Sequence, residues 1–234
     1  PQMPTLGVRV STLRRRGAWL LVVSSTAVLL TACGANASAE QDSTDGPVAV
    51  ISRLGAPTPF RGTALARPID KPDVTLKATS GGQFSLAKDT AGKLVVLYVG
   101  FTHCPDVCPT TMADTAVALK QLPKRIRDDV EVVFVTADPN RDTVKRLQSW
   151  LGFFSADIVG LTGPWDKVEQ VAHGVGIPIE KPVKGPDGSW VVEHGAEVLI
   201  FGKDGKAHEI MTSGFPPADL ANDLKLLSEG KQPA

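Results

Sequence analysis

The chain has 234 residues, of which 25 are basic (Lys and Arg) and 25 are acidic (Asp and Glu), so its formal net charge is zero. With 42% hydrophobic and 21% charged residues, the composition is that of a globular protein and excludes a disordered or collagen-like chain. The balanced charge argues against a polycationic surface for nucleic acid, and three cysteines in this length exclude a small disulfide-rich scaffold.

Residues 1–32 have the pattern of a bacterial lipoprotein signal peptide. Arg14, Arg15 and Arg16 precede an uncharged, mostly apolar run at residues 17–30. A run of about 14 residues is shorter than the ~20 that a membrane-spanning helix needs, so a secretory signal is favoured. The sequence LTAC at residues 30–33 resembles the lipoprotein cleavage signal. We therefore expect Cys33 to be acylated and to anchor the protein to the extracytoplasmic face of the cell membrane.

A flexible tether is predicted over residues 33–59, which are rich in Ala, Ser, Asp, Gly and Pro and show no sustained hydrophobic period. Residues 60–230 are expected to form one folded domain. Four arginines and no acidic residue precede position 33, so the rest of the chain carries 21 basic and 25 acidic residues. The part that folds is therefore mildly acidic.

Strand-like and helix-like segments alternate along residues 60–230. Residues 74–78 and 83–87 flank the sequence SGG and predict an N-terminal β-hairpin. Near-continuous apolar runs predict buried strands at 94–99 and 130–135, and further strands are predicted at 158–161, 190–192, 198–201 and 207–211. Helices are predicted at 112–123, 142–151, 165–176 and 218–227. This order predicts a thioredoxin-like α/β fold, with a central mixed sheet flanked by helices.

The sequence FTHCPDVCP at residues 101–109 places Cys104 and Cys108 between the first buried strand and the next helix. A thioredoxin-like fold carries its reactive cysteines here, and the N–H groups of a helix N-terminus lower the pKa of a nearby thiol. Three residues separate the cysteines, instead of the two of the usual redox motif. Pro109 disfavours helical geometry at Cys108 and favours an irregular turn. The two sulfurs can then converge on a metal ion or close into a disulfide.

This nonapeptide resembles the signature of the Sco (SenC) family. The sequence TADPNRDT at residues 136–143 resembles that family's second motif, and Glu193 with His194 stands where the family has Asp-His. The resemblance covers about residues 60–230. It departs from the family pattern at Glu193, which replaces an aspartate, and at Gly195, which replaces a small hydroxyl residue. The resemblance implies a membrane-tethered protein that helps to assemble the copper centre of cytochrome c oxidase.

Among the four histidines, the resemblance indicates His194 as a metal ligand together with Cys104 and Cys108. His103 adjoins Cys104, but the side chains of neighbouring residues usually diverge. Two thiolates and an imidazole suit Cu(I), and imidazole also accepts Cu(II). Zinc accepts the same donors, so the residue types leave the metal open and the resemblance indicates copper. Because only reduced cysteines bind the metal, metal loading and disulfide formation compete for the same sulfurs.

The leading hypothesis is an extracytoplasmic copper chaperone that passes its metal to the copper-bearing subunit of cytochrome c oxidase or to another copper protein. The alternative is a thiol–disulfide oxidoreductase, with Cys104 and Cys108 as a redox dithiol that reduces the cysteines of an apo copper site. A thiol peroxidase and a stabilising disulfide are two further interpretations. We assign no chemistry to Asp138, and we expect Arg141 and Asp142 to form a local ion pair.

Overall fold

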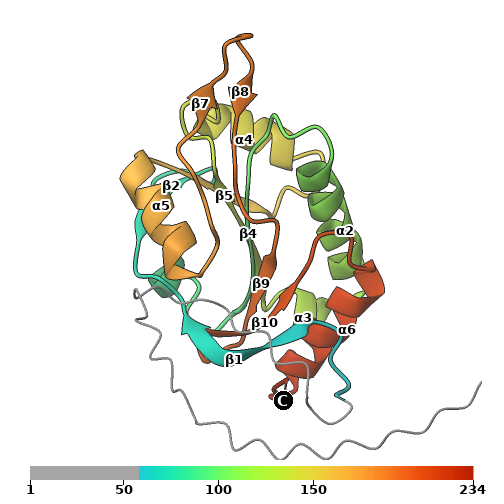
Figure 1. Cartoon of the computed structure of the whole chain (residues 1–234). Coiled ribbons are helices and arrows are strands. Elements are labelled where there is room, and N and C mark those ends of the chain that lie inside the picture. The colour runs from blue at the N-terminus through green and yellow to red at the C-terminus, as the bar shows by residue number, and fades with distance from the viewer. Residues whose placement is uncertain (1–57, 234) are drawn as a thin grey trace, which may run out of the picture. The chain divides into compact units, whose positions relative to one another are not determined.

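The computed structural model describes residues 58–233 (Figure 1). The predicted signal peptide, the predicted acylation site Cys33 and nearly all of the predicted tether lie outside the described residues. No helix within residues 58–233 combines the length and the hydropathy that crossing a membrane requires.

Ten strands and six helices follow one another along these residues. The strands are β1 Thr63–Asp70, β2 Thr75–Ala78, β3 Gln83–Ser85, β4 Leu94–Gly100, β5 Val130–Thr136, β6 Val159–Thr162, β7 Val183–Lys184, β8 Trp190–Val191, β9 Val198–Phe201 and β10 Lys206–Met211. The helices are α1 Leu86–Asp89, α2 Val107–Gln121, α3 Lys124–Arg127, α4 Val144–Leu151, α5 Trp165–Gly174 and α6 Pro217–Ser228. Eight strands form one sheet in the order β1-β10-β9-β4-β5-β6-β2-β3, and β7 pairs with β8 in a separate ribbon.

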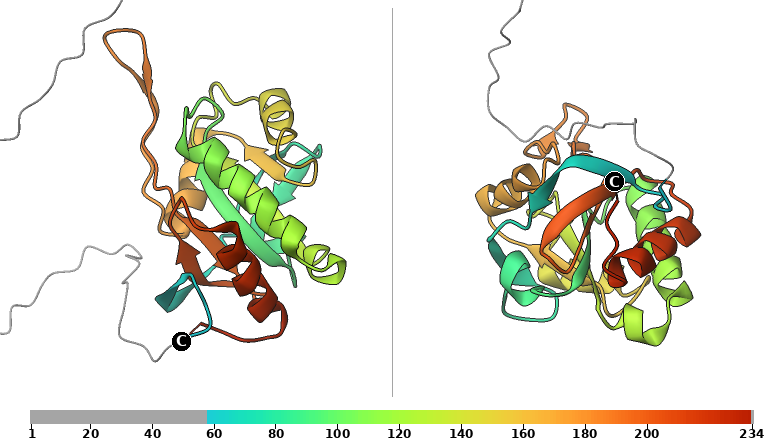
Figure 2. Two further views of the ribbon diagram at one scale, coloured as in Figure 1. Left: turned by 90° about the vertical axis from the view of Figure 1, so that its right-hand side faces the viewer. Right: turned by 90° about the horizontal axis from the view of Figure 1, so that it is seen from below.

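The sheet is mixed, as the sequence predicts, and helices cover both of its faces. Strands β4, β5 and β6 run parallel, whereas β9 and β2 join them in antiparallel pairs. Every residue of β4 is buried because alternate side chains enter two cores. One core contains Leu94, Val96 and Tyr98 of β4, which pack with α2, α4 and α6. The residues that alternate with them along β4 belong to the other core and pack with α1 and α5. The two helical layers are visible in Figures 1 and 2, and the predicted thioredoxin-like α/β fold is confirmed.

Some local predictions are wrong. The predicted hairpin forms as β2 and β3 at one edge of the main sheet, but β3 ends at Ser85 instead of residue 87. The Ser85 hydroxyl accepts a hydrogen bond from the Lys88 N–H (3.2 Å) and so begins helix α1. The sequence does not predict β1, whose register against β10 shifts between Ala64 and Ile69. The strand predicted at 190–192 does form, as β8, and it pairs with β7 outside the main sheet.

Two loops meet where the parallel strands β4 and β5 end. Gly100 and Thr136, the last residues of these strands, are register partners. The N–H of Ala137 donates a hydrogen bond to the Gly100 carbonyl (2.6 Å) just beyond them. The cysteine loop, residues 101–106, and the loop at residues 137–143 therefore lie side by side. The fold thus brings together the two motifs that are 35 positions apart in the sequence.

Candidate metal centre

The cysteine loop follows Gly100, a glycine that no other residue can replace without a collision. A Cβ at Gly100 would lie 2.7 Å from the Tyr98 ring and 3.1 Å from the Cys108 sulfur. Glycine lets the backbone approach the sulfur this closely. The N–H of Cys104 then donates to the Phe101 carbonyl (3.3 Å), which turns the chain towards α2.

Cys108 lies in the first turn of α2, so the irregular turn predicted at this residue is wrong. Pro109 is tolerated there because the first N–H groups of a helix have no carbonyl partner within the helix. One of these groups, the N–H of Cys108, donates a hydrogen bond to the sulfur of Cys104 (3.4 Å). Asp106 stands at the N-cap position of the helix. Among the described residues, its carboxylate accepts no hydrogen bond from the N–H groups of the first turn of α2. The Cys104 sulfur therefore takes the position of a capping acceptor.

The two thiols have different environments. Both are free in the described structure; Cys104 is half-buried and Cys108 is fully buried. Burial raises the pKa of the Cys108 thiol to about 12, and hydrogen bonds from the Phe101 backbone and the Tyr98 hydroxyl (3.5 Å) offset this only in part. The prediction of a lowered pKa is therefore wrong for Cys108, because the loss of water outweighs the field of the helix N-terminus.

His194 faces Cys108 across 86 positions of sequence, and its Nε2 lies 3.8 Å from the sulfur. Its Nδ1 lies 2.7 Å from the Gly195 carbonyl oxygen, so we assign the ring proton to Nδ1 and the lone pair to Nε2. Phe101 and Tyr98 pack nearly perpendicular to the imidazole, at centroid distances of 5.6 and 6.3 Å. Burial lowers the pKa of His194, which favours the neutral ring that binds metals.

The separation between Cys108 and His194 fits two ligands of one ion. Thiolate and imidazole bonds to zinc are about 2.3 and 2.0–2.1 Å long, so an angle of about 110–120° at the ion puts sulfur and nitrogen about 3.6–3.8 Å apart. The observed distance is 3.8 Å. Within residues 58–233, no three His, Cys, Asp or Glu side chains are already grouped as a metal site. The structure thus pairs Cys108 with His194 and holds Cys104 next to them through the Cys108 backbone.

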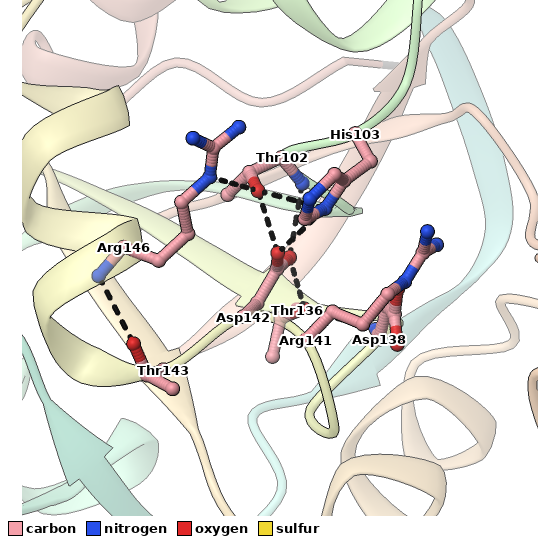
Figure 3. Close-up of polar contacts among 8 residues, drawn as sticks. All are labelled: Thr102, His103, Thr136, Asp138, Arg141, Asp142, Thr143 and Arg146. Atoms are coloured by element: carbon pink, nitrogen blue, oxygen red, sulfur yellow. Dashed lines mark hydrogen bonds and ion pairs between the residues drawn. The ribbon is translucent and has the colours of Figure 1, made fainter.

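The other histidine beside the cysteine pair points elsewhere. His103 directs its Nδ1 towards the Thr102 hydroxyl (3.3 Å) and the Asp142 carboxylate (3.5 Å), as Figure 3 shows. His173 is exposed in the last turn of α5. Neither ring approaches the sulfurs in the way that His194 does.

Asp142 has a role that the sequence alone does not indicate. This fully buried carboxylate accepts hydrogen bonds from the Thr102 N–H (2.9 Å), the Thr102 hydroxyl (2.6 Å) and the Thr136 hydroxyl (2.7 Å). Arg141 forms its ion pair with Asp138, so the predicted pair of Arg141 with Asp142 is wrong. All of these residues lie in the two motifs at residues 101–109 and 136–143, which is the only indication of their role in the sequence. The sequence does not show which of them are in contact.

Comparisons with known proteins place the chain in a family. The family model described as SCO1/SenC matches residues 71–229. The human mitochondrial SCO1 homolog is 33% identical over 145 residues, which cover 56% of this chain and 46% of the human protein. The Arabidopsis thaliana mitochondrial SCO1 homolog 1 is 31% identical over 150 residues, covering 57% and 45%. The chain thus spans about half the length of the curated relatives that it matches.

Solved structures agree with this assignment. Bradyrhizobium japonicum ScoI with copper bound has a TM-score of 0.59 and 27% identity, covering 68% of this chain and 96% of that chain. Apo Sco1 from Thermus thermophilus has a TM-score of 0.59 and 30% identity, covering 72% and 94%. Since the family model spans well over half of its residues, this chain belongs to the SCO1/SenC family.

Proposed function

We propose that this protein is a copper chaperone, held at the extracytoplasmic face of the membrane by a lipid on Cys33. Copper is its cargo, bound by Cys104, Cys108 and His194 and passed to the copper-bearing subunit of cytochrome c oxidase or to another copper protein. The observation that carries the proposal is the 3.8 Å approach of the Cys108 sulfur to the His194 Nε2. The copper-bound structure of Bradyrhizobium ScoI, a relative at 27% identity, supports the choice of metal.

The donor set and its surroundings suit a metal that is carried and then released. Soft thiolates favour Cu(I), and the imidazole allows Cu(II) as well. The rings of Tyr98 and Phe101 shield the His194 side of the site from water. Cys104 is the more exposed sulfur, so an incoming ligand from the recipient would replace it first. Stepwise ligand exchange of this kind needs no opening of the core.

A thiol–disulfide exchange role is the second candidate, and the two free neighbouring cysteines favour it. The Cys104 sulfur would attack a disulfide of the recipient, and Cys108 would then displace the recipient by closing the Cys104–Cys108 disulfide. The recipient gains two electrons and two protons and leaves as a dithiol. The raised pKa of Cys108 makes Cys104 the better attacking group.

Copper titration of the reduced protein against a competing chelator tests the metal assignment. We expect His194→Ala to weaken copper binding by about 10- to 100-fold or more. Mutation of a residue that only hydrogen-bonds to a metal ligand already lowers metal affinity by about this factor, and His194 is a proposed ligand itself. His173→Ala is the matched control, because His173 is exposed in α5 and should leave the affinity unchanged. Equal affinities of the wild type and His194→Ala would remove His194 from the site.

The same variant separates the two candidate functions. A protein that acts only as a reductase would keep its disulfide-reducing rate in His194→Ala and would not need copper. The anchor is tested separately on the full chain by membrane fractionation. Cys33→Ala should leave the membrane fraction, whereas Cys104→Ala should remain in it.

A further inference from the structure

The loop at residues 137–143, here called the DPNR loop, carries a motif to which the proposed function gives no role. It leaves β5 beside the cysteine loop, and the Ala137 N–H bonds to the Gly100 carbonyl (2.6 Å). The Asp138 carbonyl accepts hydrogen bonds from the N–H groups of Arg141 (3.2 Å) and Asp142 (2.9 Å). The loop is therefore a closed turn with a defined shape, from which two charged side chains project.

Asp142 holds the cysteine loop. Its buried carboxylate takes both the N–H and the hydroxyl of Thr102, at 2.9 and 2.6 Å (Figure 3). The Thr102 hydroxyl also accepts a hydrogen bond from the Arg146 Nε (2.9 Å). Hydrogen bonds to a charged group are roughly twice as strong as neutral ones. Thr102 stands two residues before Cys104, so Asp142 fixes the backbone that carries the more exposed thiol.

Arg141, the preceding residue, reaches the histidine side of the site. Its Nε donates to the carboxylate of Asp138, which is fully buried. Its guanidinium carbon lies 5.2 Å from the centre of the Trp190 ring, within the range of a cation–π contact. Trp190 belongs to β8 and stands four residues before His194. Arg141 therefore attaches the strand that leads to His194 to the DPNR loop.

The β7–β8 ribbon can transmit this attachment to the imidazole. His194 forms a backbone bridge with Ile179, and the Glu180 N–H donates to the Glu193 carbonyl (3.0 Å). Further along the same two segments, β7 pairs with β8. Backbone pairing therefore connects the two segments of the ribbon from His194 to Trp190. Figure 2 shows the ribbon projecting from the body of the molecule. A displacement of Trp190 relative to the body would therefore displace His194.

We propose that the DPNR loop positions both halves of the metal site. Asp142 sets the cysteine loop, and Arg141 sets His194 through Trp190. This inference rests on the proposed function, because it names the residues that fix the separation between the thiols and the imidazole. Arg141 and Asp142 are positioning residues, and neither contacts Cys108 or His194 directly in the described structure.

The sharpest variant is Trp190→Leu, which removes the aromatic face and leaves the Asp138–Arg141 ion pair intact. In the reduced full chain, purified in detergent, we expect the Cu(I) affinity to fall by about 2- to 5-fold, the full value of a cation–π contact to a ring as exposed as that of Trp190. Trp190→Phe keeps a ring for the guanidinium and should restore most of the affinity. Phe153→Ala is the matched control, because Phe153 is an aromatic side chain that is 82% exposed.

A second readout needs no copper. In nitrogen-15 NMR spectra of the apo protein, Trp190→Leu and Arg141→Ala should shift the imidazole nitrogens of His194 and leave the Thr102 amide unchanged. Asp142→Asn should do the reverse. If Arg141 acts through Trp190, the double variant Arg141→Ala/Trp190→Leu should shift His194 no more than the larger single change. Arg125→Ala, an exposed arginine of α3, is the charge control.

The outcomes separate this inference from the proposed function. If His194→Ala weakens copper binding but Trp190→Leu changes neither the affinity nor the His194 resonances, the positioning role is wrong and the proposed function stands. If the wild type binds no copper, the proposed function fails, and the resonances of the apo protein decide the positioning role alone. Should Arg141→Ala fail to fold because Asp138 loses its partner, Trp190→Leu still decides.

Discussion

The two halves of the candidate site are built in different ways. The cysteine half lies between β4 and α2, where Cys108 is packed among fully buried core residues. The histidine half, residues 178–195, includes a surface ribbon in which Val183 is 58% exposed and Val191 is 42% exposed. A thiol held in the core, that of Cys108, therefore meets an imidazole whose strand continues from a surface ribbon. This division suits a carrier, because the more exposed Cys104 can exchange its bond for a ligand of the recipient while the core around Cys108 stays folded.

The largest expected effect comes from the cysteine half. Cys108→Ser should lower the Cu(I) affinity by more than about 100-fold, because a hydroxyl is a poor substitute for a soft thiolate. The loss should exceed that of His194→Ala in the same chelator competition. Thr110→Ala, an exposed position on the same helix, is the control. A larger loss in His194→Ala than in Cys108→Ser would reverse the ranking of the two halves.

The cysteine half can also be disturbed without changing a ligand. Gly100→Ala would place a Cβ 2.7 Å from the Tyr98 ring, so we expect it to lower the free energy of unfolding by about 1–3 kcal/mol. Copper affinity should fall with it, since the same Cβ would lie 3.1 Å from the Cys108 sulfur. Denaturant unfolding measures the first effect. Gly152→Ala, at a φ of −58° and with its Cβ no nearer than 3.1 Å to the Gln148 carbonyl oxygen, should cost less stability, and a cost equal to that of Gly100→Ala would contradict the steric argument.

A buried carboxylate outside both halves of the site, that of Glu209, allows stability to be changed without changing copper affinity. Glu209 in β10 is fully buried beside Asp223 of α6, and neither of its carboxylate oxygens has a hydrogen-bond partner among residues 58–233. Burial, and then the charge of Asp223, raise its pKa from 4.5 to about 9. Between these values the folded protein keeps a proton that the unfolded chain has lost, so raising the pH favours unfolding.

The free energy of unfolding should therefore fall as the pH rises from 4.5 to about 9, by at most about 1.4 kcal/mol per pH unit. Glu209→Gln cannot ionise and should remove this part of the pH dependence while leaving copper affinity at pH 7 unchanged. Urea unfolding at several pH values compares the two proteins. Parallel pH profiles for the wild type and the variant would show that Glu209 ionises normally in the folded state.

The smallest effect is expected on the ribbon surface. Val183→Ser replaces an exposed side chain that pairs with Val191 only through the backbone register, so stability should change by less than about 0.5 kcal/mol. Its copper affinity should stay within twofold of the wild type. A loss as large as that of Trp190→Leu would mean that the general apolar character of the ribbon, and not the contact with Arg141, positions His194.

The cysteine half was the more predictable from sequence. An uninterrupted apolar run defines β4, and the cysteine spacing marks the loop after it, because both signals are local. The state of Cys108 was not predictable in the same way. Its raised pKa comes from burial in a core that includes residues of distant elements, such as Phe134 and Val198, and no local pattern reports this burial.

The histidine half depended on long-range structure. The resemblance indicated His194, but its position rests on a bridge to Ile179 and on the pairing of β7 with β8, and the strand pattern at 190–192 does not indicate either partner. The partner of Arg141 was also mistaken. Adjacency in sequence suggested Asp142 as the partner. In the structure the Asp142 carboxylate accepts hydrogen bonds from the N–H and hydroxyl groups of other residues, and the Arg141 guanidinium pairs with Asp138 instead.

X-ray absorption spectroscopy of the Cu(I)-loaded, reduced protein would identify the ligands of the copper ion. We expect two sulfur ligands at about 2.3 Å and one nitrogen ligand at about 2.0 Å, with the nitrogen lost in His194→Ala and one sulfur lost in Cys108→Ser. A copper environment that is identical in the wild type and in His194→Ala would contradict the account.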